Sequence, residues 1–149
     1  MKKILFAFEF RGRVVPGNTE THLRATSTGH SVRIESSISA ASVGGTVEQI
    51  EGEPAEFESE VMVTGETSFQ ESGIIRFGAG PNRIHFSTVG HGHIAVAAEK
   101  GFKQGAVTWK IDHGDGQFSG AAGLITSNFL VSDSGEVTDY QFGLLFVKE

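Results

Sequence analysis

The sequence predicts an all-β protein, folded as a closed antiparallel β-barrel of about eight strands. Apolar and polar residues alternate in many short segments, as they do in half-buried strands, and glycine-containing turns separate these segments at short intervals. No segment has the apolar periodicity of a helix longer than about one turn. Closure removes the exposed edges of a sheet, and a barrel of this size can hold one small ligand. A jelly-roll or cupin-like sandwich is the second candidate fold.

The size and composition of the chain indicate one domain. Its 149 residues can enclose a hydrophobic core, so we expect a single β-barrel domain over residues 1–149. Twenty glycines and only 3 prolines fit strands and tight turns better than a disordered chain. The net charge of -6 and the lack of basic clusters predict that neither nucleic acid nor an anionic membrane is a partner. The absence of cysteine excludes disulfides and thiolate chemistry.

The first ten residues predict the opening strand, in which Ile4, Phe6, Phe8 and Phe10 share one face. Two lysines followed by apolar residues resemble the start of a secretory signal. Glu9 interrupts this run before the roughly 7–15 apolar residues that such a signal needs, and no cleavage site follows. No segment approaches the ~20 apolar residues of a membrane span. We therefore expect a cytoplasmic protein.

Residues 19–60 predict polar strands followed by an acidic one. Six glutamates lie between residues 48 and 60. Glu56, Glu58 and Glu60 alternate with Phe57 and small or apolar residues, which predicts a strand with an acidic outer face. Calcium binding is the alternative, because calcium prefers clustered oxygen ligands, although the aspartate and asparagine loop typical of calcium sites is missing.

The second half of the chain predicts longer strands at residues 67–77, 83–98 and 137–147. Between the last two, residues 105–131 indicate a strand that alternates around Trp109, a glycine-rich turn, and a second strand rich in β-branched and apolar residues. These segments, with the earlier ones, give about eight or nine strands.

The glycine-rich turn resembles that of a known family. Its sequence, GDGQFSGAAG, resembles the pattern Gly-x-Gly-x-Phe/Leu-x-Gly-x-x-Gly that precedes a strand in allene oxide cyclase and dirigent-type barrels. The matching residues are Gly114, Gly116, Phe118, Gly120 and Gly123. The resemblance covers roughly residues 67–147 and extends to small bacterial barrels of the same superfamily.

The resemblance implies an antiparallel barrel with an apolar cavity that binds a small hydrophobic molecule. Some members of the superfamily cyclise reactive intermediates by shaping them in the cavity, without a metal or another cofactor. Barrels of the family often associate, so a homo-oligomer is also implied. The catalytic residues of allene oxide cyclases belong to motifs without a counterpart in this chain, and none is carried over.

The histidines of residues 83–98 are the first group that could carry chemistry. His91 and His93 form a His-x-His pair, which can ligate one metal ion in cupin-like enzymes, although the usual third and fourth ligands do not follow at the required spacing. If the opposite face, with Phe86 and Ile94, is inside, both histidines point outward. At the barrel mouth, His91 could instead act as a general base.

Glu71 and Arg76 form the second group. Glu71 shares a strand face with Phe69, which predicts a carboxylate directed into an apolar interior. Such a group needs a partner or a raised pKa. Arg76 is the expected partner in a structural ion pair, and an acid or base in the cavity is the alternative.

Aromatic residues complete the candidate site. Tyr140 lies on the apolar face of the last strand, where it either packs in the core or presents its phenol to a ligand. Trp109, Phe86 and Phe142 are expected in the core or in the wall of the cavity.

From these residues we expect a small-molecule enzyme without a cofactor, of the cyclase or isomerase type, acting on a hydrophobic substrate. His91, Glu71, Arg76 and Tyr140 are the candidate catalytic residues, because a few polar groups in a shaped cavity can hold one reactive conformer. A barrel that binds a hydrophobic ligand without catalysis is the first alternative. A cupin-like metal-dependent enzyme that uses His91 and His93 is the second.

Overall fold

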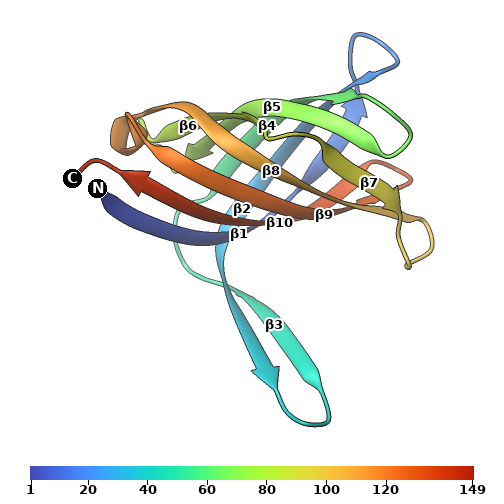
Figure 1. The fold of residues 1–149 in the computed structure, drawn as a ribbon, viewed down its shortest axis with the longest axis horizontal. Coiled ribbons are helices and arrows are strands. Elements are labelled where there is room, and N and C mark those ends of the chain that lie inside the picture. The colour runs from blue at the N-terminus through green and yellow to red at the C-terminus, as the bar shows by residue number, and fades with distance from the viewer.

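The computed structural model describes all of residues 1–149 and consists of ten strands and one 3-10 turn, η1, at Gly116–Phe118 (Figure 1). That helical segment is far too short to cross a membrane. The strands are β1 (Lys2–Pro16), β2 (His22–Ile38), β3 (Val43–Gln49), β4 (Ala55–Val63), β5 (Ser68–Phe77), β6 (Arg83–Thr88), β7 (Gly92–Val96), β8 (Phe102–Asp115), β9 (Ala122–Ser132) and β10 (Glu136–Val147).

The sheet closes into a barrel because β1 pairs with both β10 and β2. Around the barrel the strand order is β1, β10, β9, β8, β6, β5, β4 and β2, and every pair is antiparallel. β7 lies in line with β6, between β5 and β8, and β3 lies outside the barrel. The predicted fold class, a closed antiparallel barrel of about eight strands, is confirmed.

Two of the predicted strand faces are confirmed. On β1, Phe10 is fully buried, and Phe6 and Phe8 pack against the core. On β4, Phe57 and Ser59 are buried, while the three glutamates that alternate with them are exposed. These strands show the plain alternation of a sheet with one apolar face.

The single strand expected at residues 83–98 is divided into β6 and β7. The chain turns outward between them, at Val89 and Gly90, and Gly90 has a φ of 71°, which favours glycine. The backbone of Glu71 on β5 therefore loses its ladder partner at this point. The Thr88 hydroxyl replaces that partner, because it accepts a bond of 2.7 Å from the Glu71 N–H and donates one of 2.8 Å to the Glu71 carbonyl.

The last strand presents its interior face opposite to the one we expected. Tyr140, Phe142, Leu144 and Phe146 lie on the outside of the barrel, and residues of the other parity point inward. The reason is that β10 is largely apolar on both faces towards its end, so alternation alone does not identify the inner one. The inward residues are Val137, Asp139, Gln141, Gly143, Leu145 and Val147.

The half of the barrel near the two termini is filled by aromatic side chains. Phe77 packs on Phe118, with ring centroids 4.9 Å apart, and on Phe6 and Phe8 at 5.8 Å. Further along, Trp109 packs on Phe86 at 4.4 Å. Because these rings fill one half, the remaining interior space lies towards the other end of the barrel.

The second half of β2 leaves the barrel and pairs only with β3. We call the paired residues 32–38 and 43–49 the arm. Figure 1 shows the arm as a two-stranded ribbon that stands away from the barrel. Its turn is closed by Ser39, whose backbone N–H bonds to the Ser42 carbonyl at 2.9 Å.

Candidate functional site

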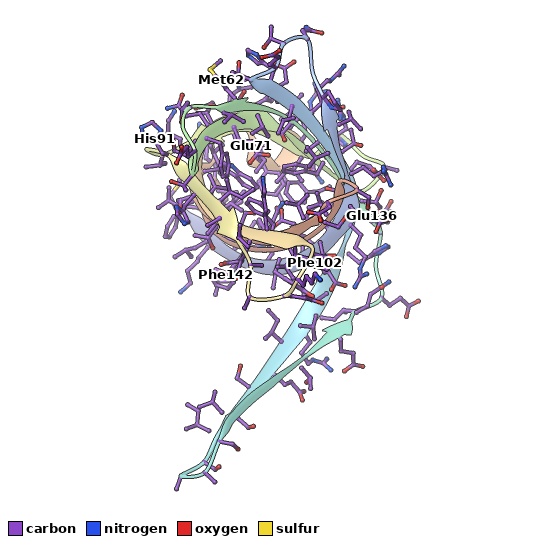
Figure 2. All side chains as sticks on the ribbon, turned by 90° about the vertical axis from the view of Figure 1, so that its right-hand side faces the viewer. Met62, Glu71, His91, Phe102, Glu136 and Phe142 are labelled. Atoms are coloured by element: carbon purple, nitrogen blue, oxygen red, sulfur yellow. The ribbon has the colours of Figure 1, made fainter.

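The barrel contains a cavity of about 390 Å³ that opens at the end away from the termini. Figure 2 looks along the barrel from this end and shows Glu71 inside the ring of strands. Half of the 24 lining residues are hydrophobic, among them Phe57, Phe69, Trp109 and Phe129. An apolar cavity with a few polar groups in its wall is the usual form of a small-molecule site.

Glu71 on β5 is the first polar group of the cavity. The Ser59 hydroxyl on the neighbouring strand β4 donates a hydrogen bond of 2.5 Å to Glu71 Oε2. Glu71 Oε1 accepts no hydrogen bond from another side chain. No lysine, arginine or histidine forms an ion pair with the carboxylate. The side chain therefore has one oxygen fixed by the barrel and one oxygen available to a ligand.

The surroundings of Glu71 raise its pKa from 4.5 to about 7. The main cause is burial, because removal of a carboxylate from water disfavours its charged form. The nearby Asp139 charge raises the pKa further, whereas the bond from Ser59 and the nearby indole N–H of Trp109 lower it. Near neutral pH, Glu71 is therefore present in both the acid and the carboxylate form.

Asp139 on β10 is the second polar group, and only 6% of its surface is exposed. The Ser127 hydroxyl donates a bond of 2.6 Å to Asp139 Oδ1, and the Gln141 amide donates one of 2.8 Å to Oδ2. Burial raises the pKa of Asp139 from 3.8 to about 6, although these two bonds oppose the effect. At pH 7 Asp139 is therefore mainly ionised, and it remains without a cationic partner.

The indole N–H of Trp109 is the third polar group. Trp109 is only 1% exposed, lines the cavity, and has no hydrogen-bond acceptor for its Nε1. The N–H lies near enough to Glu71 to lower its pKa, but not in the geometry of a hydrogen bond. A buried donor without an acceptor is unfavourable, and an acceptor atom of a bound ligand would satisfy it.

Together these groups provide two donors and one base. Protonated Glu71 and the Trp109 N–H can donate to one acceptor oxygen of a ligand, while the Asp139 carboxylate can accept a proton. A pair of carboxyl groups with different pKa values is the arrangement by which enzymes separate an acid from a base. No group of three or more histidine, aspartate or glutamate side chains is arranged to hold a metal ion.

Of the candidate catalytic residues, Glu71 lies in the cavity and Arg76 does not. Arg76 Nη1 lies on the outside of the barrel, 3.2 Å from Glu58 Oε1 on the neighbouring strand. The expected ion pair between Arg76 and Glu71 is wrong, because residues five apart along a regular strand point to opposite faces. Arg76 accordingly leaves Glu71 unneutralised.

His91 and Tyr140 also lie outside the cavity. His91 is exposed in the turn before β7, and Figure 2 shows it outside the ring of strands. His93 is exposed on β7, and no third ligand joins the two histidines, so the arrangement that a cupin-like metal site requires is not present. Tyr140 faces outward beside Glu9, and partial burial and the Glu9 carboxylate raise its pKa.

The three predicted ligand-binding aromatic residues have different positions. Trp109 lines the cavity. Phe86 is 1% exposed and packs behind Trp109, where it does not reach the cavity. Phe142 is on the outer surface, with 51% of its area exposed, because its parity on β10 is the one that faces outward.

Sequence reasoning missed Asp139 and its partners Ser127 and Gln141. A signal for Asp139 exists: it shares strand parity with Gln141, Leu145 and Val147. The opposite parity, with Tyr140 and three large apolar residues, has the stronger apolar pattern and therefore predicts the other face as the inner one. The pairing with Ser127 depends on the β9–β10 register, in which Gln141 lies opposite Ser127.

Comparison of the chain with protein-family models, with curated proteins and with solved structures found no match. The similarity to allene oxide cyclase-like barrels therefore stays a prediction from the glycine-rich turn.

Proposed function

We propose that this protein is an isomerase without a cofactor, which moves a proton along an apolar carbonyl compound held in the barrel. The observation that supports this most directly is that Glu71 and Asp139 line one cavity without a cationic partner, and that their pKa values are about 7 and about 6. Such values place both groups near the pH at which proton transfer between them and a substrate is efficient.

In the proposed reaction the substrate is a ketone with a carbon–carbon double bond one position removed from conjugation. The carbonyl oxygen accepts hydrogen bonds from protonated Glu71 and from Trp109 Nε1. The Asp139 carboxylate removes a proton from the carbon between the carbonyl and the double bond, which leaves a dienol or dienolate. Asp139 then returns this proton to the far carbon of the former double bond, so that the conjugated ketone forms and the enzyme is restored.

The lining of the cavity supports an apolar substrate of modest size. A cavity of about 390 Å³ lies at the lower end of the ~300–1,000 Å³ range of small-molecule sites. The apolar side chains of Phe57, Phe69 and Phe129 surround the polar groups and keep the local polarity low, which strengthens the hydrogen bonds to a developing negative charge.

The test uses β,γ-unsaturated cyclic ketones of one and two rings, with the ultraviolet absorbance of the conjugated product as the readout. We expect Asp139→Asn to lower the rate by about 10²–10⁴-fold, since the base is lost. Glu71→Gln should lower it by about 10²-fold or more. Glu60→Gln, on the exposed face of β4, is the control and should leave the rate unchanged.

The same compounds distinguish catalysis from passive binding. Quenching of Trp109 fluorescence reports occupation of the cavity, because Trp109 is the one tryptophan of the chain. If the ketones quench this fluorescence but are not converted faster than in buffer, the isomerase proposal is wrong. The first alternative, a barrel that binds hydrophobic ligands without catalysis, would then account for the cavity.

A further inference from the structure

The arm has one apolar face that the chain itself leaves uncovered. Ile34 pairs with Val47, and Ile38 pairs with Val43, so these four side chains lie on the same face of the ribbon. Ile38 is 84% exposed and Val43 is 77% exposed. The other face carries Arg33, Glu35 and Glu48.

This alternation is informative because the arm has no core of its own. A two-stranded ribbon with water on both sides gains only the small contribution of its cross-strand pairs from placing its aliphatic residues on one face, and such a ribbon alone is marginally stable. The apolar row also continues from Val32, which is only 6% exposed but does not belong to the barrel core. The pattern is that of a strand pair that packs against another surface.

A second uncovered apolar surface lies on the barrel itself, and we call it the wall. Leu5, Leu144 and Leu124 lie side by side across β1, β10 and β9. Phe142 and Phe146 flank Leu144 on the same outer face of β10. All five side chains are exposed, which is unusual for a group of neighbouring large apolar residues.

The arm does not cover the wall of its own chain. Figure 1 shows it directed away from the barrel, and Figure 2 shows it leaving the barrel on the side where Phe142 is labelled. Two copies related by a two-fold axis can therefore each place an arm on the wall of the other. Such an isologous contact uses the same two surfaces twice and closes, so that no further copies are added.

We propose that this protein is a homodimer in which the apolar face of each arm packs on the wall of the partner copy. An arm face about six residues long and two strands wide covers roughly 200 Å². Two contacts, each with two facing surfaces, bury about 800 Å², which is below the ~1,200 Å² of stable interfaces, so we expect a reversible dimer.

Charge also favours this pairing over contact between two walls. Two lysines lie beside wall residues: Lys3 beside Phe146, with no ion pair in its own chain, and Lys110 beside Leu124, paired with Asp112 Oδ1 at 2.6 Å. On the arm, Arg33 pairs with Glu48 at 3.8 Å, which leaves Glu35 as its one charge without an ion pair. Two facing walls would bring the two copies of Lys3 together, whereas an arm brings one uncompensated negative charge towards the wall that holds Lys3.

Sedimentation equilibrium of the purified full chain tests the proposal. We expect the mass of two chains for the natural protein and for Ser37→Asp, which changes the polar face of the arm. Ile38→Asp should raise the dimer dissociation constant by about 100-fold, because an unpaired carboxylate would be buried in the contact. Ile38 is so exposed that this change should leave the circular dichroism spectrum of the barrel unaltered.

A cross-linking experiment distinguishes arm-to-wall contact from other dimers. The chain has no cysteine, so Ile38→Cys and Leu144→Cys introduce single thiols. On oxidation, a mixture of the two variants should give a disulfide between unlike chains, whereas a mixture of Ser37→Cys with Leu144→Cys should not. A dimer that Ile38→Asp leaves intact would overturn the proposal. A natural protein that stays monomeric, or that instead sediments with phosphatidylcholine vesicles, would overturn it as well.

Discussion

The ring of Phe10 on β1 lies over Gly29, its direct partner on β2. A Cβ atom placed on Gly29 would fall 2.5 Å from a ring carbon of Phe10, so no other residue fits beneath the ring without a shift. The same relationship recurs across three other strand pairs. These pairs are Phe6 with Gly143, Phe69 with Gly92, and Phe129 with Gly105. At these four positions the barrel accommodates a large inward ring by omitting the side chain opposite it.

We expect Gly29→Ala to destabilise the protein by about 3 kcal/mol, because the added methyl group overpacks the site against a buried ring. Urea unfolding followed by circular dichroism measures the change. Gly44→Ala in the arm is a matched control, since its Cβ would lie 3.5 Å from Ser37 Oγ, at an ordinary contact distance. Equal stability of both variants would show that the ring can move aside at little cost.

The stability of the protein should fall as the pH rises from about 4.5 to 7. In this range the unfolded chain releases the Glu71 proton while the folded protein retains it, so protons stabilise the folded state. For a shift from 4.5 to about 7 the loss is at most about 3 kcal/mol, and solvent access through the cavity reduces it. The raised pKa of Asp139, about 6, gives a dependence of the same sign between about pH 3.8 and 6. In urea unfolding experiments Glu71→Gln should therefore remove the fall between about pH 6 and 7 and leave the part due to Asp139, whereas Glu60→Gln should change neither part.

The fluorescence of Trp109 should titrate with Glu71, since its indole N–H lies near the carboxylate. We expect a midpoint near pH 7 in the natural protein and no transition in this region in Glu71→Gln. Asp139→Asn should move the midpoint to lower pH, because the negative charge at Asp139 contributes to the raised pKa of Glu71. An unchanged midpoint in Asp139→Asn would mean that the two carboxyl groups do not interact.

If the proposed isomerisation occurs, its rate should show a narrow, bell-shaped dependence on pH. Activity rises as Asp139 ionises, with a pKa of about 6, and falls as Glu71 loses its proton, with a pKa of about 7. The two groups influence each other, so the measured limbs belong to the pair. In Glu71→Gln the residual activity should keep the acidic limb and lose the alkaline one. A plateau above pH 8 in the natural protein would argue against Glu71 as the donor.

The fold class could be predicted from the sequence because alternation and turns are local signals. β1 and β4 have one apolar and one polar face, and their inner sides were assigned correctly. The inner side of β10 could not be predicted in this way, because Phe142 and Phe146 on the outside are as apolar as Leu145 and Val147 on the inside. If the wall is covered by a partner copy, as we propose, both faces of β10 are buried surfaces, and alternation carries no information there.

The candidate site could be predicted only in part, for the same reason. Glu71 was placed in the interior because its strand has Phe69 and Ile75 on one face. Asp139 could not be predicted in the interior, since the apolar residues around it indicate the opposite face of β10 as the inner one. The approach of Ser59 to Glu71 could not be predicted either, because it depends on pairing between strands. Gly29, Gly92, Gly105 and Gly143 lie within strands beneath aromatic rings, a role that appears only once the register is known.

The Thr88 hydroxyl takes the place of a backbone partner for Glu71, and this should make the neighbouring part of the barrel open more readily. The ladder of β5 passes from β6 to β7 beside Glu71, and the only bonds from β6 to the Glu71 backbone go through one side-chain hydroxyl. Segments with fewer backbone bonds open at lower free energy than the rest of a protein. We therefore expect the amide protons near Glu71 to exchange with deuterium sooner than those elsewhere in the barrel strands. If the sheet opens in this way between β5 and the break from β6 to β7, a ligand can reach Glu71 through the side of the barrel as well as through its open end.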